Sequence, residues 1–194
     1  MSPVMEHTSV PPWALEPTAR PGGGELPTDP KAAACTILSY DAEEAVSRWK
    51  RQLEEAAIPH ETVPLVPCGR QHDGGTLPQE QEVLARCFAA AKVGWRLMIA
   101  GPLADVLRAR SLALEAGLLD EEILVATTQT DLLPVFCAHC EETTLAEAAI
   151  DDVVDCSSCA EPLLIYYHIS RRRGSFLGFK VDAEEWSPEE VGGR

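Results

Sequence analysis

Basic residues are scarce in this sequence. The 194 residues include 16 lysines and arginines against 31 aspartates and glutamates, which gives a formal net charge of −15. Because contact with a phosphate backbone requires a basic surface, nucleic acid is not expected as a partner. No run of about 18 apolar residues occurs, so no membrane span is expected. The first residues lack the charged-then-apolar order of a secretion signal, and the expected location is the cytoplasm.

Motifs for nucleophilic catalysis and for phosphate binding are also missing. No Gly-x-Ser-x-Gly turn is present. Nucleotide-binding folds carry a glycine-rich turn after the first strand, whereas this chain has Ser39-Tyr40-Asp41-Ala42 there. His60 and His72 fall in predicted loops and are interpreted as surface residues. The sequence therefore predicts no catalytic residue and no residue that binds an organic cofactor.

The cysteines are the most informative residues that are present. Seven of them, an odd number in a chain without a secretion signal, indicate reduced thiols rather than a disulfide framework. Cys35, Cys68 and Cys87 have no partner at metal-ligand spacing, and Cys35 and Cys87 are interpreted as small buried residues. The other four form two Cys-x-x-Cys pairs separated by residues 141–155. These four predicted metal ligands are Cys137, Cys140, Cys156 and Cys159.

The spacing of the two pairs is typical of a zinc ribbon. Each pair can place two thiolates on one tight turn, and the spacer is long enough for a hairpin that brings the turns together. Iron in a rubredoxin-like site is the main alternative, and an iron–sulfur cluster is a further one. Rubredoxin turns usually carry glycine after the second cysteine, where this chain has Glu141 and Ala160. The sequence therefore favours Zn²⁺, with His139 left out because four cysteines suffice.

The chain before residue 129 is divided into two predicted regions. Residues 1–32 are rich in proline and contain Gly22-Gly23-Gly24, which indicates an extended tail or an arm that lies along a partner subunit, anchored by Trp13. Residues 33–128 alternate between strand and helix patterns. The predicted strands are 35–40, 61–66, 95–100 and 122–126, and the predicted helices are 42–57, 78–92 and 103–116.

This alternation predicts an α/β domain, a small parallel sheet with helices on both faces. A strand that ends in Gly101-Pro102 and leads into a helix is similar to the nucleotide domain of ferredoxin-reductase-type flavoproteins. The glycine-rich turn and the Arg-x-Tyr-Ser motif of such proteins are missing. We therefore interpret the domain as a degenerate scaffold, with NADPH binding at Gly101-Pro102 as the alternative.

Residues 129–182 predict a small zinc-ribbon-like antiparallel β module, too poor in apolar residues for an independent core and held by its metal. Its charges are segregated, with six acids and no base in residues 141–155 and four bases and no acid in residues 166–180. One interpretation is a hairpin whose arginine turn, Arg171-Arg172-Arg173, balances the acidic spacer. The other is a surface for protein docking. Residues 183–194 form a predicted acidic tail.

Three segments carry a resemblance to a known family. Residues 136–140, 155–159 and 164–179 resemble the C-terminal region of the DmmA-like proteins, the small subunit of bacterial dimethylamine monooxygenase. The resemblance is most specific over residues 134–184. It implies a hetero-oligomeric complex that demethylates dimethylamine oxidatively to methylamine and formaldehyde, using O₂ and NADPH. It also implies haem, FMN and an iron–sulfur centre on partner subunits.

Taken with the residues themselves, the resemblance predicts a zinc-binding, non-catalytic subunit of such a complex. No recognisable haem-ligation or flavin pattern occurs in this chain. Two alternatives remain open: an electron-transfer subunit with a rubredoxin-like iron centre, and a reductase fragment that binds NADPH.

Overall fold

Four apolar segments form a parallel sheet. A computed structural model describes residues 9–70 and 78–181 of the chain. Strands β1 (Ala34–Tyr40), β2 (His60–Leu65), β3 (Trp95–Gly101) and β4 (Ile123–Thr127) pair in the order β2-β1-β3-β4, all parallel. The predicted strands and their parallel arrangement are confirmed. A likeness to the ferredoxin-reductase nucleotide domain stays a prediction.

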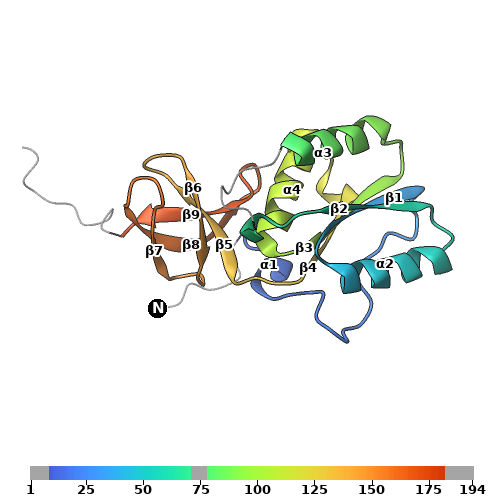
Figure 1. Ribbon diagram of the computed structural model, residues 1–194, viewed down its shortest axis with the longest axis horizontal. Helices are drawn as coiled ribbons and strands as arrows, with labels where there is room; N and C mark the ends of the chain where they lie inside the picture. Colours follow the sequence, from blue (N-terminus) through green and yellow to red (C-terminus); the bar gives the residue numbers. More distant parts are fainter. Residues whose placement is uncertain (1–8, 71–77, 182–194) are drawn as a thin grey trace, which may run out of the picture.

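Helices cover both faces of this sheet, as predicted (Figure 1). Helix α2 (Glu43–Glu55) buries Val46, Trp49 and Leu53 at helical spacing, and these side chains pack on one face. Helices α3 (Pro78–Ala90) and α4 (Leu103–Glu115) pack on the other. The central strands β1 and β3 are buried on both faces, which explains why they read as continuous apolar runs.

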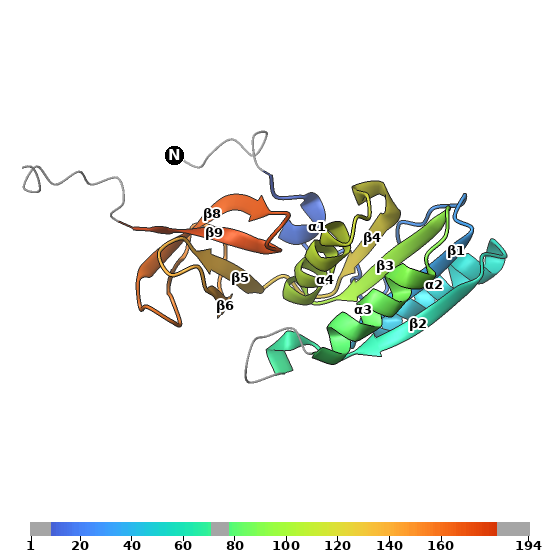
Figure 2. The same cartoon turned by 90° about the horizontal axis from the view of Figure 1, so that it is seen from above.

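The cysteine-containing half forms a second sheet, beside the first (Figure 2). Its order is β6-β5-β9-β8-β7. The strands are β5 (Leu132–Cys137), β6 (Thr143–Glu147), β7 (Val153–Asp155), β8 (Pro162–Ser170) and β9 (Ser175–Lys180).

The prediction of an antiparallel module is wrong at one pair, because β5 and β9 run parallel. The reason lies in the cysteine turns. The first turn follows the end of β5 and the second precedes the start of β8, so the turns meet only if these strands run in opposite directions. Strand β9 lies between them and is antiparallel to β8, which makes it parallel to β5.

Residues 9–32 lie along this chain itself rather than free of it. Helix α1 (Pro12–Leu15) buries Ala14 in the core of the second sheet, whereas Ala19 and Leu26 are buried in the core of the first. Apart from α1, the segment has no helix or strand in the described residues. Its backbone carbonyls are held by side chains: Trp49 Nε1 donates to Pro27 O at 3.0 Å, and Arg48 donates to the carbonyls of Arg20 and Gly24.

The arginine turn joins the two sheets. Arg171 forms an ion pair with Asp120 at 2.8 Å, and the hydroxyl of Ser111 on α4 donates to Arg172 O at 2.5 Å. Gly174 lies against the same helix, where a Cβ would be 2.5 Å from Leu107 O. The ion pair of Arg171 is thus made with the α/β half and not with the acidic spacer, contrary to the first interpretation of this turn.

Some predicted features fall outside the described residues, namely His72, most of the loop after Cys68–Arg70, and the acidic tail at 183–194. Within the part of the chain that the structure describes, no helix is both long enough and apolar enough to cross a membrane.

Candidate metal centre

The four cysteines come from two turns, one between β5 and β6 and one between β7 and β8. Their sulfurs all lie within 4.8 Å of one another. Cys137 Sγ is 3.8 Å from Cys159 Sγ, and Cys140 Sγ is 3.5 Å from Cys156 Sγ. Four sulfurs about 2.3 Å from a central ion would be about 3.8 Å apart at the edges of a tetrahedron. The arrangement therefore fits a four-thiolate metal site.

The two turns have the same backbone geometry. The N–H of Glu141 donates to Cys137 O and the N–H of Cys137 donates to Glu142 O, at 2.9 and 2.8 Å. Ala160 and Glu161 make the equivalent bonds with Cys156, both at 2.9 Å. The two turns are thus equivalent halves of one site.

Both turns reach this geometry without glycine. Glu141 has φ of 64° and Ala160 has φ of 57°, in the left-handed region that glycine usually supplies. The absence of glycine after each second cysteine, which weighed against iron in the sequence, therefore does not prevent the turns from forming.

Backbone N–H groups favour the thiolate form of Cys156, the first residue of the second turn. Hydrogen bonds from the backbone N–H of Cys159, and next of Ser158, outweigh burial and lower the pKa of Cys156 to about 6. An N–H from Glu161 favours the thiolate of Cys159, but burial and the three neighbouring sulfurs outweigh it and raise the pKa of that thiol. A cation among the sulfurs would favour the deprotonated form, since thiolates are the form that binds metal.

The four cysteines lie beside the apolar core of the second sheet. Cys137 and Cys156 are buried and Cys140 and Cys159 are half-buried, all in contact with that apolar cluster. The N–H of Ser157 donates to Thr144 Oγ1 at 3.0 Å, which ties the second turn to β6. His139 is exposed and outside the group of converging ligand atoms.

The three remaining cysteines are buried and form no disulfide. Burial raises the pKa of each thiol. The interpretation of Cys35 and Cys87 as small buried residues is confirmed. The environment of Cys68 was not foreseen: its N–H donates at 2.8 Å to Oδ1 of the fully buried Asp105. No local pattern links these two residues, since they lie in different elements.

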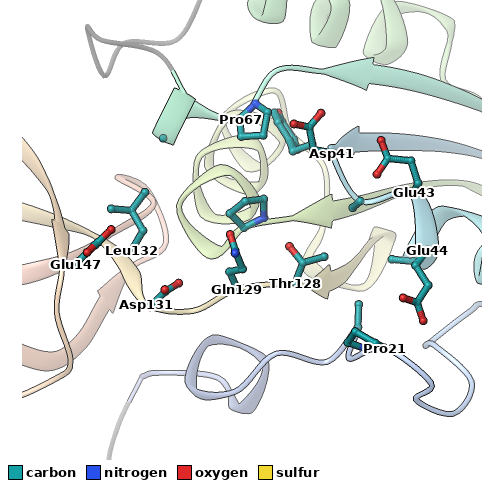
Figure 3. A pocket seen from close by; sticks show the side chains of 16 residues that line it. Pro21, Asp41, Glu43, Glu44, Pro67, Thr128, Gln129, Asp131, Leu132 and Glu147 are labelled. Atoms are coloured by element: carbon teal, nitrogen blue, oxygen red, sulfur yellow. The ribbon is translucent and has the colours of Figure 1, made fainter.

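A cavity of about 570 Å³ lies at the carboxyl ends of β1, β3 and β4, where parallel sheets usually bind ligands (Figure 3). Among its described lining residues none is basic, whereas five are acidic: Asp41, Glu43, Glu44, Asp131 and Glu147. Close packing explains the glycine of the Gly101-Pro102 pair, since a Cβ there would be 2.6 Å from Tyr40 Cβ. This cavity is electrostatically unsuited to a nucleotide phosphate.

Two comparisons with known proteins found a match, one to the cysteine-containing half and one to most of the chain. Residues 134–179 match the family described as "Dimethylamine monooxygenase subunit DmmA-like, C-terminal domain". The chain is also 32% identical over 159 residues to the heme-dependent oxidative N-demethylase delta subunit of Ectopseudomonas mendocina (strain ymp). That alignment covers 81% of this chain and 85% of the relative. No solved structure matches the chain.

Proposed function

The chain belongs to the family of DmmA-like dimethylamine monooxygenase subunits, and we propose that it is the zinc-binding, non-catalytic subunit of a haem-dependent oxidative N-demethylase. The observation that carries the proposal is the identity over 159 residues, which extends through both halves of the fold. The reaction would be the O₂- and NADPH-dependent demethylation of dimethylamine to methylamine and formaldehyde. Haem, FMN and the iron–sulfur centre would belong to partner subunits, and the complex would be cytoplasmic.

The proposed role of the metal is structural. Cys137, Cys140, Cys156 and Cys159 would fill a tetrahedral shell and leave no open position for substrate. Zinc in such a shell contributes folding free energy, which a small sheet needs. We place the boundaries of this zinc-ribbon-like module at residues 129 and 182, after an α/β domain at 33–128 and an N-terminal segment at 1–32.

Metal analysis of the purified full chain tests this proposal. We expect about one zinc per chain, a colourless protein, and no demethylation activity from the chain alone. The Cys140→Ser variant should lose most of the metal, whereas Cys35→Ser, which changes a buried cysteine outside the centre, should keep it. A visible absorption band from the full chain would contradict the zinc assignment.

A rubredoxin-like iron centre is the second candidate. The N–H groups that point at the Cys156 sulfur favour it, because such hydrogen bonds tune the potential of an iron–thiolate site. The two candidates differ in one measurement. Iron would give a coloured protein that bleaches on reduction, whereas zinc would leave the spectrum unchanged by either oxidant or reductant.

A further inference from the structure

Part of the outer face of the second sheet is apolar. Val153 on β7 lies opposite Leu164 on β8, which lies opposite Phe179 on β9. Directly opposed residues of neighbouring strands share one face of a sheet. The intervening residues, such as Leu163 and Ile165, point to the other face and form the core. Three strands therefore present a continuous apolar row on the side away from the core.

The large apolar side chains in this row and next to it are exposed. Within the described residues, seven large apolar side chains are exposed, and four of them are here: Val153 (53%), Tyr166 (48%), Phe179 (44%) and Val181 (54%). The rings of Tyr166 and Phe179 pack edge to face with centroids 5.3 Å apart. Clustering of this kind on a surface indicates an interaction site, whereas scattered single residues do not.

Arginines border the same face. Leu177 on β9 lies opposite Phe136 on β5, and the guanidinium of Arg173 lies 3.9 Å from the centre of the Phe136 ring. Arg172 and Arg173 are exposed, and neither forms an ion pair with a described residue. Among the described residues, one carboxylate, that of Glu115, lines the same hollow as these two arginines.

The turn that carries the arginines is fixed in place. The carbonyl of Arg172 accepts from Ser111, and Gly174 is packed against the backbone of α4. A charged group on a fixed turn loses less conformational entropy on binding than one on a free loop. The apolar face of the sheet and the two arginines beside it are thus held in fixed positions relative to each other.

We propose that this face, defined by Val153, Leu164, Tyr166, Phe179 and Val181 and bordered by Arg172 and Arg173, is the docking surface for another subunit of the proposed N-demethylase. The inference rests on the proposed function. The partner surface would carry apolar side chains and carboxylates. A second copy of this chain fits less well, because it would bring the same arginines and another net charge of −15 to the contact.

The test uses the full chain co-expressed with the other subunits of the same enzyme. The first variant, Tyr166→Ser with Phe179→Ser, removes the aromatic pair. The second, Arg172→Glu with Arg173→Glu, reverses the basic border. The matched control is Val93→Ser with Leu119→Ser, which changes exposed apolar residues outside this face. Metal content and melting temperature of each variant report on its folding.

We expect the aromatic variant to bind its partner subunit about tenfold or more weakly, and the arginine variant to associate more slowly. The control should bind as the wild type does. If the wild type binds and both variants bind equally well, the surface is wrong while the proposed function stands. If the wild type binds none of the subunits, the proposed function fails. Loss of self-association alone in the variants would assign the face to a second copy and overturn the inference.

Discussion

At the scale of single residues, the metal centre depends on two backbone conformations that its side chains do not favour. Glu141 and Ala160 take positive φ at equivalent positions in the two turns. An L residue in the left-handed region costs about 1–2 kcal/mol. The turns persist because each has two backbone hydrogen bonds and a shared metal site to hold it.

Ala160→Gly should therefore stabilise the chain. Glycine relieves the left-handed strain, and the greater freedom of glycine in the unfolded chain offsets part of this gain. The expected increase in the free energy of unfolding is about 0.5–1 kcal/mol, measured by urea denaturation at fixed metal content. Ala57→Gly is the matched control, since Ala57 has φ of 54° at the end of α2 and lies far from the cysteines in sequence. A less stable Ala160→Gly variant would show that the turn uses its methyl group.

Asp105 is the other residue with an unusual environment. It is fully buried, and its Oδ1 accepts hydrogen bonds from the Cys68 N–H and the Arg108 guanidinium, each at 2.8 Å. Asp105→Ala should destabilise the chain by about 3 kcal/mol, because the buried donors lose their acceptor. Asp105→Asn, which keeps an acceptor oxygen, should cost less. Equal losses for the two variants would argue that the charge matters and the hydrogen bonds do not.

The same carboxyl gives a pH dependence with a defined sign. Burial raises the pKa of Asp105 above its ordinary value of 3.8, and its Oδ2 has no partner among the described residues. The folded chain therefore binds this proton more tightly than the unfolded chain. The stability of the wild type relative to Asp105→Asn should fall as pH rises from 3.8 through the raised pKa, and then level off. Urea midpoints of both proteins across this range measure it, and a rise would contradict the assignment.

At the scale of elements, local patterns predicted most of the fold. The strands at 35–40 and 95–100 were visible as short continuous apolar runs, and the helix with Trp49 was visible because its apolar residues recur at helical spacing. The spacing of the cysteines likewise predicted that their sulfurs meet. The parallel pairing of β5 with β9 was not visible, because it follows from where two distant turns must converge. The left-handed turns were not visible either, because glutamate and alanine give no signal for that conformation.

The course of residues 9–32 was missed for a related reason. Its backbone carbonyls accept hydrogen bonds from side chains of α2, and Thr127 in β4 binds Thr18 and the carbonyl of Trp13. Such contacts leave no periodic trace in the segment itself, whose proline and glycine residues only argue against a long helix. The side chains that bind this segment belong to α2 and β4, which are distant from it in sequence.

The contact between the arginine turn and α4 makes a prediction about Gly174. This residue has φ of 61°, and a Cβ would be 2.5 Å from Leu107 O. Gly174→Ala should destabilise the chain by about 2–4 kcal/mol, from left-handed strain and from overpacking together. Gly22→Ala is the matched control, because Gly22 has φ of 68° and nothing within 4 Å of its Cβ position. Equal shifts in melting temperature would show that the turn is not packed as described.

At the scale of the whole molecule, charge argues against nucleotide binding. The cavity at the carboxyl edge of the parallel sheet has five acidic lining residues in a chain of net charge −15. We expect no saturable binding of NADPH at about millimolar ligand, because phosphate would be repelled in the cavity. Titration of the full chain, followed by nicotinamide fluorescence, measures this. Saturation that survives 0.15 M salt, about the ionic strength at which surface charges are largely screened, would restore the reductase alternative.

The two halves should also respond together when metal is removed. The cysteines hold the turns at one end of the second sheet, and the arginine turn at the end of β8 packs on α4. Loss of the metal should therefore loosen β8 and β9 and, through Ser111 and Leu107, the side of α4 that faces the arginine turn. Strands β1 and β2 lie on the far side of the first sheet from this contact and should keep their protection. Hydrogen exchange before and after chelation measures each element, and melting should fall by about 10 °C if the metal contributes about 3 kcal/mol.

A cysteine variant controls for effects of the chelator itself. Cys140→Ser with Cys159→Ser already lacks two of the four thiolates, so added chelator should change neither its exchange nor its melting temperature. If the amides of α4 in the wild type keep full protection from exchange while those of β8 and β9 lose theirs, the arginine turn does not couple the two halves. In that case the metal would stabilise only the small sheet, and the α/β half would fold without it.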